Sequence, residues 1–280
     1  MRIIHTDVLR DAVREMCIEA NLVLSNDVKG KILSAEEKET AELGRKILSQ
    51  LKENMEIAEQ EAIPICQDTG MAIIFLEIGQ EVHFEGEYLE DAINEGVRKG
   101  YADGYLRKSV VGDPLLRVNT KDNTPAIIHT QIVPGDKVKI TVAPKGFGSE
   151  NMSRVCMLKP ADGEEGVKEA VLETVRLAGP NACPPMVVGV GIGGDFEKCA
   201  ILAKKALTRN LDKHSELSHI RAMEEELLEK INRLNIGPGG LGGMTTALGV
   251  NIETYPTHIA GLPVAINICC HVNRHVTREI

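Results

Sequence analysis

The chain has 280 residues, 43% hydrophobic and 26% charged, so one large domain or two modest ones can bury a sizeable core. Its formal net charge of -9 and its 3% aromatic content without tryptophan argue against a nucleic-acid binder, which usually shows a basic face and aromatic platforms. Residues 1–7 contain no signal-peptide hydrophobic region, and no apolar run approaches the ~20 residues that cross a bilayer. We therefore expect a cytoplasmic protein that binds neither nucleic acid nor membrane.

The first half of the chain begins with predicted helices. Apolar residues at helical spacing predict a helix capped by Thr6 or Asp7, and Ser34 with Glu37 forms the sequence pattern of a capping box. The elements expected in this half are helices over 6–20, 34–61 and 87–108, a strand over 72–78, and a hairpin of two strands over 126–142 around Pro134 and Gly135.

The second half alternates strands and helices. Its expected elements are helices over 166–177 and 215–234, strands over 186–192 and 262–269, a helix capped by Asp195, and a glycine-rich loop over 237–243. These patterns predict a mixed α/β (α+β) fold, with a helical N-terminal part followed by mixed sheets flanked by helices. We expect one domain over 1–280, with a weakly marked sub-boundary near residue 150.

Two glycine motifs allow a nucleotide interpretation. Gly189-x-Gly191-x-x-Gly194 matches the dinucleotide fingerprint, but the acidic residue expected about 20 positions later, at the end of a second strand, is missing. Tight strand-to-helix turns also select glycine. The loop over 237–243 lacks the Lys-Ser/Thr pair of a P-loop, and we interpret it as a backbone surface that lets a ligand approach closely. A nucleotide-binding oxidoreductase remains an alternative.

The seven cysteines are an odd number at long spacings, which argues against a disulfide framework. Cys17 and Cys199 lie on predicted amphipathic helices and are expected in the core, and the core is also favoured for Cys156. The others lie on loops or at a strand end: Cys66, Cys183, and the adjacent Cys269 and Cys270.

Three loop cysteines suit an iron–sulfur cluster with one incomplete corner. A full set of four thiolates is typical of electron transfer, whereas an iron without a protein ligand suits Lewis-acid chemistry. Zinc bound by Cys270, His271 and His275 is a weaker alternative, because compact zinc sites usually contain CxxC-type knuckles and none occurs here.

At these residues the chain resembles the iron–sulfur hydro-lyases, the family of class I fumarase and L-tartrate dehydratase. The match covers essentially the whole chain and is to the α subunit of the two-subunit form, equivalent to the N-terminal domain of the single-chain form. Six ordered motifs carry the resemblance: 66–70 (CQDTG), 107–114 (RKSVVGDP), 119–125 (NTKDNTP), 145–149 (KGFGS), 179–183 (GPNAC) and 270–274 (CHVNR).

The resemblance implies a [4Fe-4S] cluster with one open iron site, held by Cys66, Cys183 and Cys270. Cys270 is preferred over Cys269 because the last ligand of the family is followed, four residues later, by an arginine, which is Arg274 here. The fold implied is that of the α-type iron–sulfur hydro-lyases.

The resemblance also implies the residues that act on the substrate. Asp68 would be the general acid, and the substrate-binding residues would be Gln67, Arg107, Gly146, Gly148 and His258. Arg107 would clamp a carboxylate with two hydrogen bonds. Each has a structural alternative: Asp68 can cap the turn with Thr69 and Gly70, Arg107 can complement a helix dipole, and a lone histidine is more often structural.

The activity implied is the reversible hydration of fumarate to (S)-malate, with L-tartrate dehydration as the alternative. In single-chain relatives a C-terminal domain completes the site, and this chain ends at Ile280, soon after the last ligand. We therefore expect a separate β subunit in an α2β2 assembly and little activity from this chain alone. A non-catalytic metal-binding assembly protein is an alternative of a different class.

Overall fold

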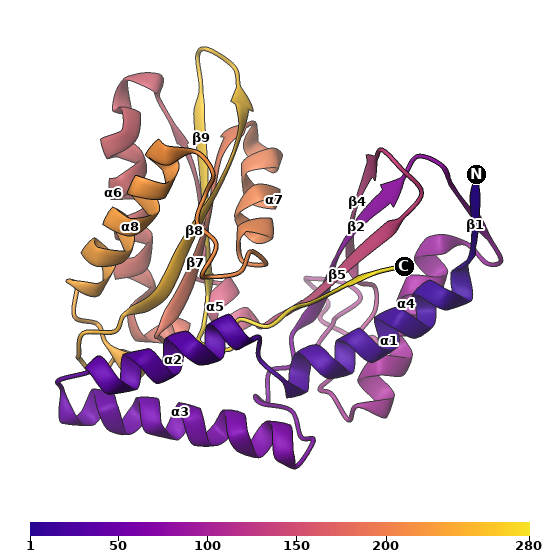
Figure 1. The fold of residues 1–280 in the computed structure, drawn as a ribbon, viewed down its shortest axis with the longest axis horizontal. Coiled ribbons are helices and arrows are strands. Elements are labelled where there is room, and N and C mark those ends of the chain that lie inside the picture. Colours follow the sequence, from indigo (N-terminus) through magenta and orange to yellow (C-terminus); the bar gives the residue numbers. More distant parts are fainter. The chain divides into compact units, whose positions relative to one another are not determined.

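The computed structural model describes residues 1–280, which form two compact units, each with its own sheet and helices (Figure 1). Unit 1 comprises Met1–Ser25, Met55–Phe147 and Arg274–Ile280, and unit 2 comprises Asn26–Asn54 and Gly148–Asn273. Both units combine helices with mixed sheets, which confirms the predicted mixed α/β (α+β) class. None of the helices has both the length and the apolar character that crossing a bilayer requires.

Unit 1 is built on a four-stranded sheet in the order β10-β5-β2-β4. Its strands are β2 (Met71–Gly79), β4 (Ile127–Val133), β5 (Val138–Lys145) and β10 (Val276–Glu279), and β1 (Arg2–His5) pairs separately with β3 (Val82–Glu85). Helices α1 (Thr6–Leu22) and α4 (Leu89–Asp103) share one hydrophobic cluster with this sheet. Leu9, Val13 and Cys17 of α1 are fully buried there, as their spacing predicted.

The hairpin predicted over 126–142 is wrong in its pairing, although both of its strands exist. β2 lies between β4 and β5, parallel to the first and antiparallel to the second. The β4–β5 connection crosses the end of β2, where Gly79 N–H donates to Lys137 O at 2.8 Å. Pro134 and Gly135 correctly predicted that the chain reverses direction between the two strands. They give no information on the earlier strand, β2, that lies between β4 and β5.

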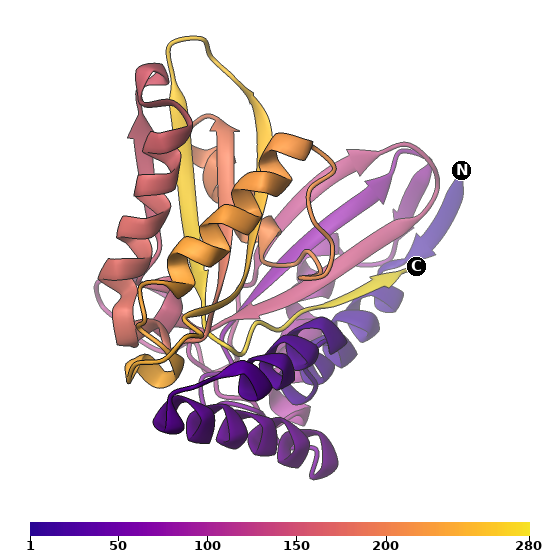
Figure 2. The same cartoon turned by 60° about the vertical axis from the view of Figure 1, so that its left-hand side comes forward.

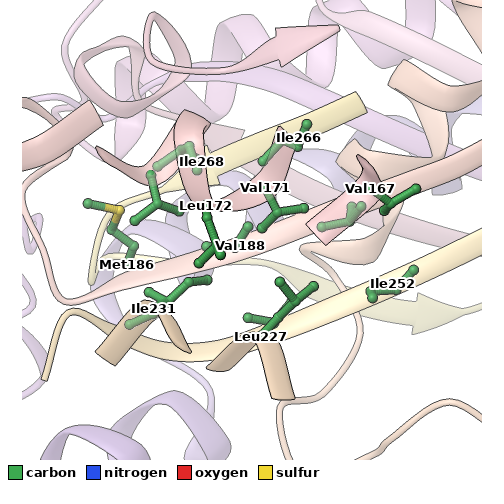
Figure 3. Packing of buried hydrophobic residues seen from close by; sticks show 14 of the residues in the cluster. Val167, Val171, Leu172, Met186, Val188, Leu227, Ile231, Ile252, Ile266 and Ile268 are labelled. Carbon is green, nitrogen blue, oxygen red and sulfur yellow. The ribbon is translucent and has the colours of Figure 1, made fainter. Parts of the chain in front are cut away.

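Unit 2 has helices on both faces of its sheet (Figures 1 and 2). The strand order β6-β9-β7-β8 joins β6 (Arg154–Leu158), β9 (Leu262–Cys269), β7 (Met186–Gly194) and β8 (Ala247–Thr257). Helices α6 (Gly163–Ala178) and α8 (Ser218–Asn232) cover one face, and α7 (Phe196–Ala206) covers the other. The larger core lies under α6 and α8, where Val171 and Leu227 meet Val188 of β7 (Figure 3).

The glycines of the dinucleotide-like motif allow a helix to pack closely on β7. A Cβ at Gly189 would lie 2.3 Å from Ala203 O, and a Cβ at Gly191 would lie 2.0 Å from Cys199 O. Asp195 caps α7 as predicted, since its carboxylate accepts from Lys198 N at 2.9 Å. Close packing of α7 accounts for Gly189 and Gly191 without a bound nucleotide, which weighs against the nucleotide alternative.

The charged helix expected over 34–61 is two helices, α2 (Asn26–Lys38) and α3 (Glu42–Gln60). Ser34 lies inside α2, so the predicted capping box is wrong. The chain leaves the helix at Glu39, which is completely buried and accepts from Ala41 N at 3.0 Å. A series of charges at helical spacing gives no sign that one glutamate is buried, so the break was not predicted.

Two helix ends also differ from the prediction. The N-cap of α1 is His5, whose Nδ1 accepts from the Asp7 N–H, rather than Thr6 or Asp7. Helix α4 ends at Asp103, so Arg107 does not lie at a helix C-terminus. Its predicted structural role beside a helix dipole is therefore wrong.

Candidate functional site

The loop that carries Cys66 is fixed in unit 1 by hydrogen bonds and by close packing of its backbone. Tyr101 of α4 donates its hydroxyl to Thr69 O at 2.9 Å, and Thr69 Oγ1 donates to Arg107 O at 3.1 Å. Burial raises the pKa of Tyr101, so its hydroxyl stays a donor. Gly70 has a φ of +78°, and a Cβ there would lie 2.7 Å from the backbone of Lys145, so only glycine fits.

Asp68 is half-buried in this loop and accepts two backbone hydrogen bonds. Its Oδ1 accepts from Gly70 N at 3.0 Å, which is the turn-capping contact foreseen as the structural alternative. Its Oδ2 accepts from Phe147 N at 2.9 Å, beyond the end of β5. The carboxylate therefore has a fixed position, and its structural role accompanies any chemical one.

Two buried cations lie beside the loop of Cys66 and Asp68, and the sequence did not assign either to the site. Arg274 is only 4% exposed; its Nη2 donates to Asp68 O and its Nε to Pro144 O. Its Nη1 is buried without a hydrogen-bond partner. Lys145 is also buried, and its Nζ donates to Gly146 O at 3.1 Å. In the sequence, Arg274 stands out only as the last residue of the motif over 270–274. That motif was used to choose Cys270 as a ligand, and it did not predict a contact of Arg274 with Asp68.

Replacing Arg274 by methionine should lower the free energy of unfolding measurably. Two buried carbonyls, those of Asp68 and Pro144, would each lose a donor, at about 1–3 kcal/mol per group. Arg278→Met is the matched control, because Arg278 is 36% exposed and pairs with Glu15 and Glu19 at the surface, where ion pairs contribute about 0–1 kcal/mol. Equal loss of stability in the two variants, measured by urea unfolding, would contradict the buried role of Arg274.

The other residues predicted to bind the substrate differ in their exposure and contacts. Gln67 is exposed, with its Oε1 3.7 Å from Cys66 Sγ, and the Arg107 side chain is exposed as well. A Cβ at Gly146 would lie 3.1 Å from Asp68 Oδ2, whereas a Cβ at Gly148 would meet nothing within 4 Å. The N–H between these two glycines, that of Phe147, is already bound to Asp68.

In unit 2 the structure brings Cys183 and Cys270 to the same edge of the sheet. Val187 at the start of β7 pairs with Cys269 at the end of β9, so the residues just outside both strands are neighbours. His271 Nδ1 lies 3.1 Å from Cys183 O, which links the two segments directly. Cys183 is exposed and has a left-handed backbone, with a φ of 51°.

His258 lies at the opposite end of β9 from Cys270. The eight residues of β9 span roughly 26 Å at about 3.3 Å per residue. His258 accepts from Ala260 N through its Nδ1 and lines a hollow of about 450 Å³ with Lys198 and Tyr255. Within one chain His258 is therefore not beside Cys183 or Cys270, and its part in substrate binding stays a prediction.

The donor chemistry of the three loop cysteines fits a cluster. None of them is disulfide-bonded, and Cys66, Cys183 and Cys270 are half-buried or exposed on non-helical backbone. By contrast, burial raises the pKa of Cys17 to about 12 and also raises that of Cys199, which disfavours the thiolate that a metal needs.

In unit 1 a fixed carboxylate and two buried cations thus accompany the loop of Cys66, and in unit 2 Cys183 and Cys270 lie on neighbouring segments. Residues 10–279 match the model of the family described as Fumarate hydratase (Fumerase), and the chain belongs to this family. The predicted family is thus confirmed, and with it the reaction class, which is that of a hydro-lyase.

Two relatives extend this comparison over nearly the whole chain. A protein of Methanocaldococcus jannaschii named "Putative L(+)-tartrate dehydratase subunit alpha" is 44% identical over 279 residues, 97% of each chain. The "L(+)-tartrate dehydratase subunit alpha" of Escherichia coli K12 is 33% identical over 258 residues, which cover 91% of this chain and 84% of that protein.

Proposed function

We propose that this chain is the α subunit of an iron–sulfur hydro-lyase that interconverts fumarate and (S)-malate in the cytoplasm, together with a separate β subunit in an α2β2 assembly. The observation that carries the proposal is the set of three cysteines on non-helical backbone, Cys66, Cys183 and Cys270, as the ligands of a [4Fe-4S] cluster. The half-buried Cys270 is a better candidate than the buried Cys269. The relatives named as subunits alpha support the partner chain.

A cluster with one iron free of protein ligands supplies, when bound, a Lewis acid that weakens the C–O bond to the departing hydroxyl. Asp68 would exchange a proton with that oxygen as general acid, from a position fixed by Gly70 N and Phe147 N. Gln67 and Arg107, both exposed, would bind the substrate carboxylates, with Gly146 and Gly148 offering backbone around them. The carbon-bound proton would go to a base on the β subunit.

L-Tartrate dehydration is the second candidate, and the printed names of the relatives favour it. Malate and tartrate differ by one hydroxyl at the carbon that loses its proton. The residues proposed here would contact the carboxylates and the departing hydroxyl, so they would not discriminate between the two substrates. A site built to hydrogen-bond the extra hydroxyl would discriminate strongly, by about 10⁴-fold or more.

The test is to reconstitute the chain with iron and sulfide under anaerobic conditions, with and without the β subunit, and to assay both substrates. We expect an iron–sulfur absorption spectrum from the α chain alone, and fumarate hydration only after the β subunit is added. A higher kcat/KM for L-tartrate than for malate would replace the first candidate by the second. A purified protein that carries zinc and no iron would contradict the cluster itself.

A further inference from the structure

The glycine-rich loop over 237–243 has no role in the proposed chemistry, and the structure shows what it contacts. Gly239 N–H donates to Pro184 O at 2.8 Å, next to Cys183. Gly240 lies directly against Pro180, since a Cβ there would be 2.3 Å from Pro180 Cβ. The loop therefore packs on the turn that carries Cys183, and its interpretation as a surface for ligand approach is replaced by close contact with another backbone.

The turn beneath this loop is short and strained. Cys183 has a φ of 51° without being glycine, and its N–H donates to Pro180 O at 3.1 Å. Its carbonyl lies 3.1 Å from His271 Nδ1. A left-handed cysteine persists only where its surroundings hold it, and Gly239, Gly240 and His271 provide such contacts on the two sides of the turn.

The glycine loop is itself anchored by a buried carboxylate. Glu39 Oε1 and Oε2 accept from Met244 N at 3.1 and 2.9 Å, and Oε2 accepts from Thr245 N at 3.2 Å. Burial by itself would raise the pKa of Glu39, but hydrogen bonds from backbone N–H groups lower it below its ordinary value, so the carboxylate stays ionised. A Cβ at Gly243 would lie 2.9 Å from Glu39 Oε2, so the loop backbone closes over the carboxylate.

A buried charge is costly, and this one is held by neutral backbone donors at the break between α2 and α3. The carboxylate fixes Met244 and Thr245, which directly follow the glycine loop and precede β8, and thereby holds the loop that covers Pro180 and Pro184. We propose that Glu39 and the glycine loop are positioning residues for Cys183: they hold its turn in the conformation that presents the thiol to the cluster. This inference rests on the proposed function only for the identity of what Cys183 binds.

Two glycine variants separate this contact from general backbone strain. Gly240 and Gly242 both have a left-handed backbone, with φ of +74° and +87°, so alanine costs similar strain at each. Only at Gly240 does the new Cβ collide with Pro180, because a Cβ at Gly242 meets nothing within 4 Å. Gly240→Ala should therefore displace the Cys183 turn, and Gly242→Ala should leave it in place.

The first measurement is the rate at which reconstituted full-length α chain loses iron to a chelator. Gly240→Ala should lose iron about 10–100-fold faster than Gly242→Ala, because loss of the contacts that support a metal ligand typically weakens metal binding by that factor. Glu39→Gln should also lose it faster, because its amide group turns a donor toward Met244 N or Thr245 N. Glu42→Gln is the charge-matched control, since Glu42 is exposed and pairs with Lys46 at the surface.

The second measurement is hydrogen exchange at the amides of the Cys183 turn, those of Asn181, Ala182, Cys183 and Met186, in the chain before iron is added. Faster exchange there in Gly240→Ala and Glu39→Gln, but not in the controls, supports the positioning role even if no cluster ever forms. Wild-type protein that binds no iron would then overturn the proposed function alone. Equal exchange and equal iron loss in Gly240→Ala and Gly242→Ala would overturn the positioning role.

Discussion

Replacing Cys66, Cys183 or Cys270 by serine, one at a time, should abolish the cluster and the activity of the reconstituted enzyme. Serine is isosteric but is not ionised near neutral pH, so the iron at that corner loses its protein ligand. We expect the iron content to fall from about four atoms per chain to a small fraction of that amount, as for any cluster held by protein thiolates. Loss of a Lewis acid worth several kcal/mol lowers the rate by about 10²–10⁴-fold or more.

Cys156→Ser is the matched control, because Cys156 is half-buried on β6 and lies outside the proposed site. This variant should keep the iron content, the visible absorption and the catalytic rate of the wild-type enzyme. Loss of the cluster in this control as well would mean that serine disturbs folding rather than ligation. Cys269→Ser decides between neighbours: if it loses the cluster and Cys270→Ser does not, the third ligand is Cys269.

The sequence predicted those parts of the fold whose side chains repeat with one clear period. β7 and β9 are short, continuous apolar runs buried between helices, and α6 has a regular apolar stripe, so all three were located within a few residues. β8 was not predicted, because its second half is exposed and contains Pro256. Pairing was predicted less well than strand position, since β2 enters between β4 and β5 from a distant segment.

In the candidate site, too, local sequence features identified some residues, and only the folded chain identified others. Flanking prolines and glycines placed Cys66 and Cys183 on loops, and the family resemblance assigned their partners. Arg274 and Glu39 were missed because their importance comes from burial against residues far away in the chain. A charged residue in a polar sequence is solvated in most proteins, so only the folded chain distinguishes these two from their neighbours.

Replacing Asp68 by asparagine should lower kcat by about 10²–10⁴-fold, the usual contribution of a positioned general acid. The amide retains an oxygen for the Gly70 N–H, so the turn of 68–70 keeps its cap. It cannot transfer a proton to the departing hydroxyl. Substrate binding should persist, because Gln67 and Arg107 are unchanged, and the change in the cluster spectrum on adding malate measures it directly.

The structural role of Asp68 makes the accompanying measurements essential. In Asp68→Asn the amide nitrogen would face the Phe147 N–H, so one of the two hydrogen bonds of the carboxylate is lost. If that loss alone explained the phenotype, iron content and thermal stability would fall together with activity. Full iron, wild-type stability and a malate-dependent spectrum with a slow turnover would instead assign the proton transfer to Asp68. Wild-type turnover in this variant would leave Asp68 as a turn cap and move the general acid to another residue.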